Sequence, residues 1–214
     1  MPRGVFISLD GLDGTGKSTQ CRLLAERLRA NDLAVTTCTD PGGTELGAKL
    51  REILLFGREI GMGNLAEALL FMASRAELVE RVIRPALLAG HVVISDRYTL
   101  ANVVYQGHAA GLNPDDIWKI GKIATEGLFP SLTLVFDLPP EVAEVRRGRD
   151  ADRLESRGPE YHRRVRDGFL IEARSDPERI KVIDASPSVD AVQRRVWDVV
   201  RELLRVRGFK SVGE

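Results

Sequence analysis

The pattern of apolar positions along the chain predicts short strands that alternate with helices. The expected strands are almost continuously apolar, as parallel strands are when helices cover both faces of their sheet. They cover residues 5–9, 33–38, 91–95, 132–138 and 180–184. Apolar residues at helical spacing predict helices over 18–30, 44–56, 64–89, 114–127, 140–147, 159–175 and 188–207. This alternation predicts a three-layer α/β fold, in which a doubly wound five-stranded parallel sheet binds ligands at the carboxyl ends of its strands.

Length and composition favour a single domain over residues 1–214. The chain is 43% hydrophobic, which is enough to bury one substantial core. Its formal net charge is zero, which argues against a dedicated nucleic-acid partner. No apolar run approaches the roughly 18 residues of a membrane span, and no signal-peptide pattern is present, so we expect a cytoplasmic protein without a membrane partner. Cys21 and Cys38 lack metal-type spacing and are predicted to be buried thiols.

A glycine-rich loop follows the first predicted strand and precedes a predicted helix. It matches the pattern G-x-x-x-x-G-K-[ST] with Gly11, Leu12, Asp13, Gly14, Thr15, Gly16, Lys17 and Ser18. Such a P-loop lets successive backbone N–H groups converge on phosphate oxygens, and the helix N-terminus adds a favourable dipole. The loop, together with Thr19, is therefore predicted to bind a nucleoside triphosphate. Lys17 would reach the β- and γ-phosphates, and the Ser18 hydroxyl would ligate Mg²⁺.

The third predicted strand ends in Asp96 and Arg97. A buried strand that ends in a carboxylate can deliver it beside the phosphates and the metal, so Asp96 is predicted to join Ser18 at Mg²⁺. Arg97 offers a fork-shaped group that binds phosphate. No N-K-x-D motif of the kind that reads guanine is present, which argues against a GTPase.

A run of arginines suggests a lid over about residues 147–158. The run includes Arg146, Arg147, Arg149, Arg153 and Arg157. A kinase needs a second anion site and a cationic lid that neutralises charge while it excludes water, and this run fits the lid.

Several motifs together resemble the thymidylate kinase family over residues 5 to about 204. They are "DPGGTELGAKLR", "LLFMASR", "SDRY" and "NVVYQG", together with the P-loop. The resemblance implies transfer of a phosphoryl group from ATP to dTMP, giving dTDP, with Mg²⁺ and in a homodimer. Because Gly14 stands where the eukaryotic type has an arginine, the chain resembles the bacterial type, which supplies a catalytic cation from its lid.

The resemblance assigns the base-binding residues. Phe71 matches the platform on which thymine stacks, and an aromatic face suits a flat base. Arg75 resembles the arginine that donates a hydrogen bond to a base carbonyl. Asn102 and Gln106 share a helix face at the spacing of the family's nucleoside contacts. Tyr105 is similar to the tyrosine that crowds the sugar 2′ position.

The remaining roles concern the phosphates. Arg51 and Arg97 match the positions that grip the dTMP phosphate, and Asp40 falls where the family has a carboxylate near the sugar and the acceptor phosphate. Asp10 occupies the place of an acidic residue near the transferred group. The resemblance points to Arg149 and Arg153 as the lid residues that touch the γ-phosphate. It places Arg147 and the loop 184–187 near adenine.

The residues alone leave other functions open. The chain could be another nucleoside or nucleotide kinase, or a P-loop regulatory ATPase without transfer activity. Arg51 and Arg97 favour an acceptor that already carries a phosphate. Intact Lys17, Ser18 and Asp96 argue against a lost activity.

Overall fold

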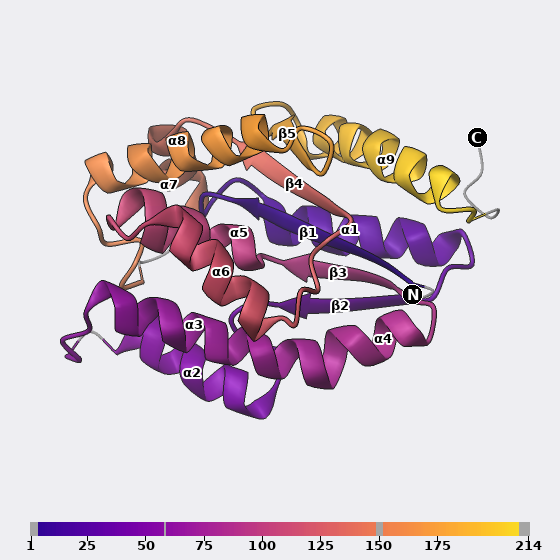
Figure 1. The fold of residues 1–214 in the computed structure, drawn as a ribbon. Coiled ribbons are helices and arrows are strands. Elements are labelled where there is room, and N and C mark those ends of the chain that lie inside the picture. Colours follow the sequence, from indigo (N-terminus) through magenta and orange to yellow (C-terminus); the bar gives the residue numbers. More distant parts are fainter. Residues whose placement is uncertain (1–3, 58, 149–151, 210–214) are drawn as a thin grey trace.

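The described residues fold around one parallel sheet. The computed structural model describes residues 4–57, 59–148 and 152–209. Within them, five strands form a sheet of order β2-β3-β1-β4-β5, and all neighbouring strands are parallel (Figure 1). The strands are β1 Val5–Gly11, β2 Val35–Thr39, β3 Val92–Asp96, β4 Leu132–Asp137 and β5 Ile180–Asp184. This arrangement confirms the predicted α/β fold class.

Alternate residues of β1 pack against helices on opposite faces of the sheet. Ile7 and Leu9 share a core cluster with Leu24 and Leu28 of α1 (Lys17–Ala30). Phe6 belongs to a second cluster, which the chain after residue 78 covers. This period of two is what a strand buried on both faces requires. The remaining α-helices are α2 Glu45–Phe56, α3 Asn64–Leu78, α4 Arg84–Leu88, α5 Thr99–Asn102, α6 Pro114–Ala124, α7 Pro140–Arg147, α8 Pro159–Ser175 and α9 Val189–Val206.

The helix predicted over 64–89 consists of three contiguous pieces. α3 passes into a wider π-helical turn, η1 (Val79–Ile83), and α4 follows it. Pro85 lies at the start of α4 and has no N–H to donate to the preceding turn, so the change of helix type occurs where an α-helical hydrogen bond is unavailable.

The structure contains a helical segment over residues 99–109 that the apolar pattern does not predict. α5 continues into a π-helical turn, η2 (Val103–Ala109), on the segment that carries Asn102 and Gln106. The expected shared face is confirmed, because Asn102 Nδ2 donates to Gln106 Oε1 at 2.8 Å.

The prediction of two buried thiols is confirmed for one of them. Cys21 is buried, whereas Cys38 is half-buried, and both are free thiols.

Strand register brings the predicted site residues to one edge of the sheet. Asp96, the last residue of β3, lies beside Leu9 of β1 and Thr39 of β2. Asp96 is therefore near both the P-loop, which follows β1, and Asp40, which follows β2. In the part of the chain that the structure describes, no helix combines the length and apolar character that crossing a bilayer demands.

Candidate active site

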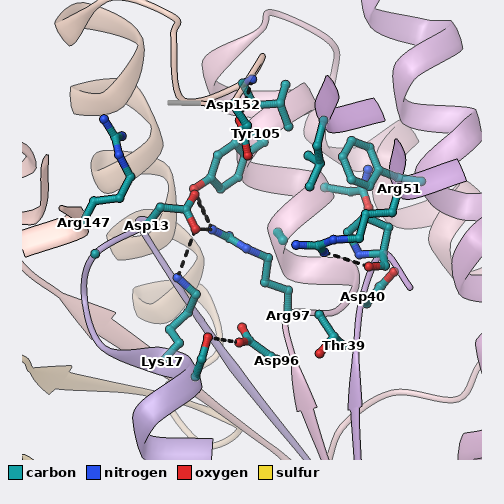
Figure 2. Close-up of a pocket in the computed structure, with 18 of the residues that line it drawn as sticks. Asp13, Lys17, Thr39, Asp40, Arg51, Asp96, Arg97, Tyr105, Arg147 and Asp152 are labelled. Atoms are coloured by element: carbon teal, nitrogen blue, oxygen red, sulfur yellow. Dashed lines mark hydrogen bonds and ion pairs between the residues drawn. The ribbon is translucent and has the colours of Figure 1, made fainter. Parts of the chain in front are cut away.

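One cavity of about 350 Å³ opens at the carboxyl edge of the sheet (Figure 2). Its first end is lined by the P-loop and the start of α1. The predicted residues that line this end are Asp13, Gly14, Gly16, Lys17, Ser18 and Thr19. Arg147 also lines the cavity, on the other side of Asp13 from Arg97 (Figure 2).

The far end of the cavity gathers the residues predicted to bind substrate. They come from four separate segments of the chain and are Asp40, Arg51, Phe71, Arg75, Asn102 and Gln106. Arg97 and Tyr105 line the middle, and Asp96 lies at the P-loop end beside Ser18. The cavity therefore joins a phosphate-binding loop to a cluster of arginine, amide and aromatic side chains.

The P-loop is built around Lys17. Its side chain is 5% exposed, and Nζ donates to Leu12 O at 2.7 Å and lies 3.8 Å from Asp13 Oδ1. Burial, and next the charge of Arg97, lower the pKa of Lys17. Gly16, the N-cap of α1, has φ 91° and no side chain to cap the helix, so the first-turn N–H groups remain available to an anion.

Gly14 packs against α7 so closely that no side chain fits. A Cβ at this position would lie 1.9 Å from Ala143 O, and the residue has φ +86°. The sequence indicated only that a cation is missing from the loop at this position. The structure adds that an arginine at position 14 would require α7 to move.

Ser18 and Asp96 offer oxygen ligands at the P-loop end. Ser18 Oγ donates to Asp96 Oδ2 at 2.5 Å. Hydroxyl and carboxylate oxygens suit a hard cation such as Mg²⁺, which is commonly held by one or two protein groups together with substrate phosphates. In the described part of the chain, no group of three or more histidine, cysteine, aspartate or glutamate residues could cage an ion by itself. The residues present thus fit an ion that arrives with a nucleotide.

Arg97 crosses the middle of the cavity. Its backbone is left-handed (φ 69°), a conformation that costs energy for a residue other than glycine. Nη2 donates to both carboxylate oxygens of Asp13 at 2.8 Å and to Tyr105 Oη at 3.2 Å, whereas the buried Nη1 has no hydrogen-bond partner. Burial alone would lower the pKa of Arg97, but Asp13 and further anionic neighbours raise it well above the usual value. The guanidinium is therefore charged and has a donor available.

Asp10 lies buried beside the cavity without lining it. The residue is 0% exposed, and neither of its carboxylate oxygens has a hydrogen-bond partner. Burial raises the pKa of Asp10 to about 7, although Arg97 and Lys17 act in the opposite direction. An unpartnered buried carboxyl is costly, so its retention beside the phosphate site suggests a functional reason.

Arg75 is held by protein groups at the far end of the cavity. It is 1% exposed, and it donates to Asp40 Oδ2 and to Asn102 Oδ1, both at 2.5 Å. Phe71 packs with Leu54 and Leu154 in a small apolar cluster. Asp40 was expected near the sugar and the acceptor phosphate, and the structure shows that it is also the counter-ion of Arg75.

The predicted lid arginines occupy different places. Arg149 lies outside the described residues. Arg153 Nε donates to Leu54 O at 2.8 Å, and its Nη2 lies 2.6 Å from Glu67 Oε2. Arg146, the first residue of the predicted arginine run, lines the cavity and donates to Ala185 O at 2.7 Å and to Ser186 O at 2.8 Å. Arg146 thereby ties α7 to the loop 184–187.

Glu67 is a site residue that sequence reasoning missed. It is 0% exposed, and it contacts both Gln106 and the arginine-rich segment. A signal was present, because Glu67, Phe71 and Arg75 are spaced four residues apart and share one face of α3.

The P-loop, the strand-end Asp96 and the second group of arginines in one cavity define the chain as a P-loop kinase of the type that phosphorylates small phosphorylated acceptors.

Comparisons with known proteins identify the family within this class. The thymidylate kinase family profile matches residues 9–196. A thymidylate kinase of Symbiobacterium thermophilum is 48% identical, over 98% of each chain. One from Deinococcus radiodurans is 43% identical, over 94% of this chain and 98% of its own. The crystal structure of thymidylate kinase from Ehrlichia chaffeensis is similar with a TM-score of 0.75 and 30% identity, covering 92% of this chain and 98% of that one. The chain belongs to the thymidylate kinase family.

The pKa of Asp10 predicts a pH-dependent contribution to stability. Because folding raises this pKa from 3.8 to about 7, the folded state holds a proton that the unfolded state releases as pH rises. The contribution is complete below pH 3.8 and is lost by about pH 7, a change of up to roughly 4 kcal/mol. Asp10→Asn removes this titration. Denaturant unfolding at pH 5 and pH 8 should therefore show a smaller loss of stability with rising pH for the variant, and parallel pH profiles would contradict the shift.

Gly14 and Gly16 form a matched pair that tests the contact with α7. Both glycines have positive φ, but a Cβ at Gly16 meets no atom within 4 Å. Gly16→Ala should cost only the backbone strain, about 1–2 kcal/mol. Gly14→Ala should cost roughly 1–3 kcal/mol more, because α7 must shift. Thermal unfolding of the ligand-free protein measures the difference, and equal losses would show that the contact with Ala143 is unimportant.

Proposed function

We propose that this thymidylate kinase binds ATP at the P-loop end of the cavity and dTMP at the far end, and transfers the γ-phosphoryl group between them to give dTDP. One observation carries the proposal: a single cavity joins the P-loop to Arg51 and Arg97 and then to Phe71 and the amides. Two anion sites in line are the main requirement of phosphoryl transfer. The family match favours this activity over the other kinases and the regulatory ATPase.

At the ATP end, the loop residues Gly11 to Ser18 and Thr19 surround the phosphates. Lys17 supplies positive charge to the β- and γ-phosphates, and its burial strengthens that interaction. Ser18 and Asp96 would hold Mg²⁺, which supplies charge neutralisation between phosphate oxygens when bound. Arg147 and the loop 184–187 lie toward adenine, and Arg146 fixes that loop.

At the acceptor end, Arg51 and Arg97 would grip the dTMP phosphate. Arg51 lines the cavity while its Nη1 donates to Pro41 O at 2.9 Å, so the side chain is already oriented. Arg97 Nη1 has no hydrogen-bond partner and would donate to a phosphate oxygen. Asp10, beside Arg97, would take or hold a proton near the transferred group.

The base end would bind thymine between an aromatic face and polar side chains. Phe71 would stack on the ring, an interaction worth about 1–3 kcal/mol per base. Arg75, Asn102 and Gln106 line the same end and would bind the polar edge of the base, with Asp40 as counter-ion. Tyr105 accepts a hydrogen bond from Arg97 and would lie against the sugar.

The lid contribution is part of the same proposal. Arg149 and Arg153 are the arginines proposed to reach the γ-phosphate. Arg153 is paired with Glu67, so it would have to exchange that carboxylate for phosphate oxygen during the reaction. Arg97 and Lys17 already face the cavity and need no such exchange.

We also propose that the protein acts as a cytoplasmic homodimer. Among the exposed apolar side chains, Leu46 and Ile53 lie on α2, and Leu65 and Leu69 lie on α3. Their exposed fractions range from 37% to 53%. A second copy of the chain seated on this face would bury them.

An acceptor screen tests the proposed activity. ADP release measured with dTMP, dUMP, CMP, AMP and thymidine should be fastest with dTMP, and absence of dTMP-dependent ADP would refute the proposal. Arg97→Ala should lower turnover by about 10³-fold or more, because the acceptor phosphate loses its clamp, while ATP binding survives. Arg84→Ala is the matched control. Arg84 is on α4, does not line the cavity, and pairs with Glu126 at the surface. Retained turnover in Arg97→Ala would exclude the clamp role.

Variants of the lid arginines test the catalytic cation. Arg149→Ala and Arg153→Ala should each lower kcat by about tenfold or more while the KM for ATP changes less, because the charge acts mainly in the transition state. Steady-state kinetics with varied ATP separates the two parameters, and Arg163→Ala, at an exposed pair on α8, serves as the control. Unchanged kcat in both variants would move the cation elsewhere, with Arg147 the next candidate.

A further inference from the structure

A buried carboxylate at Glu67 connects the base end of the cavity to the arginine-rich segment. Glu67 is in the first turn of α3 and is wholly inaccessible to solvent. Its Oε1 accepts from Gln106 Nε2 at 2.9 Å, and its Oε2 accepts from Arg157 Nη2 at 2.7 Å and pairs with Arg153 Nη2 at 2.6 Å. A buried charge needs such compensation, so three side chains converge on one carboxylate.

The same carboxylate ends a directed chain of hydrogen bonds. Arg75 donates to Asn102 Oδ1, Asn102 Nδ2 donates to Gln106 Oε1, and Gln106 Nε2 donates to Glu67. A guanidinium only donates and a carboxylate only accepts, so the two ends of the chain permit one orientation of both amides. Because Asn102 and Gln106 line the cavity, their remaining donors and acceptors face a base in a fixed pattern.

The arginines at Glu67 also place a cap on the base end. Leu154 lies between Arg153 and Arg157 in the sequence, lines the cavity and packs in the cluster that contains Phe71. Arg153 N also donates to Leu55 O at 2.9 Å, which fixes the same segment to the end of α2. Loss of charge at position 67 would therefore loosen both the amide orientation and the apolar cover of the base site.

We propose that Glu67 is a positioning residue that fixes the hydrogen-bond polarity of Asn102 and Gln106 and anchors the segment of Arg153 and Arg157 over the base site, so that it contributes to the choice of base. This inference rests on the proposed function. Thymine presents an N3–H donor and an O4 acceptor, whereas cytosine presents an N3 acceptor and an N4 donor. A hydrogen-bond chain with a fixed direction distinguishes these two patterns of donors and acceptors. If the amides could flip, the hydrogen-bond chain would distinguish them less well.

The main test is Glu67→Gln, which keeps the size of the side chain but can donate as well as accept. KM for dTMP should rise about tenfold, and the preference for dTMP over dCMP in kcat/KM should fall about threefold or more. KM for ATP should stay within about twofold. Glu172→Gln is the control. Glu172 is also buried and also forms two hydrogen bonds, with His108 and Trp118, but it does not line this cavity. It should leave all three values unchanged.

A second variant tests the connection even where Glu67→Gln folds poorly. Among the described residues, Arg157 does not line the cavity, and its side chain donates to Glu67 Oε2 and to Tyr161 Oη. Arg157→Gln should raise KM for dTMP about threefold, and the effect should be non-additive with Glu67→Gln. A wild-type KM for dTMP in Arg157→Gln, or wild-type KM and base preference in Glu67→Gln, overturns the inference while leaving the proposed function intact. Failure of the wild-type chain to bind dTMP refutes both.

Discussion

The site depends on the half-buried Arg97, which lies between the P-loop and the far end of the cavity. The guanidinium is held by Asp13 of the P-loop and Tyr105 of η2, and its backbone leaves β3 in a left-handed conformation. These contacts join three segments that are distant in sequence. An arginine that is largely withdrawn from solvent keeps its charge and needs an anionic partner, and the carboxylate of Asp13 supplies it beside the P-loop.

The same logic applies to the other charges around the cavity. Lys17 is buried against Leu12 O and Asp13, and Arg75 is buried against Asp40 and Asn102. These cations are fixed before substrate arrives, so little reorganisation is needed when phosphate charge enters the cavity. Asp10 is the exception, since its carboxyl is buried without a hydrogen-bond partner. Burial raises the pKa of this carboxyl to about 7, and such raised carboxyl pKa values are common at functional sites.

The far end of the cavity is organised by a chain of hydrogen bonds with a fixed direction. The amides of Asn102 and Gln106 lie between an obligatory donor, Arg75, and an obligatory acceptor, Glu67. Glu67 also forms ion pairs with Arg153 and Arg157, so the two amides and the arginine-rich segment meet at one carboxylate. The arginine run that the sequence analysis treated as a lid therefore has two parts. Arg146 and Arg147 line the P-loop half of the cavity, and Arg153 and Arg157 belong with the base end.

Local patterns were sufficient for the fold class, the P-loop and the family, because periodicity, glycine spacing and short motifs lie within a few residues of each other. Only tertiary structure revealed the left-handed Arg97, the contact of Gly14 with Ala143, the unpartnered Asp10 and the partners of Glu67. Glu67 and Arg157 are 90 residues apart, and Arg97 and Asp13 are 84 apart. The pairing of these charged groups depends on how the helices pack against one another. The spacing of residues along the chain does not specify that packing.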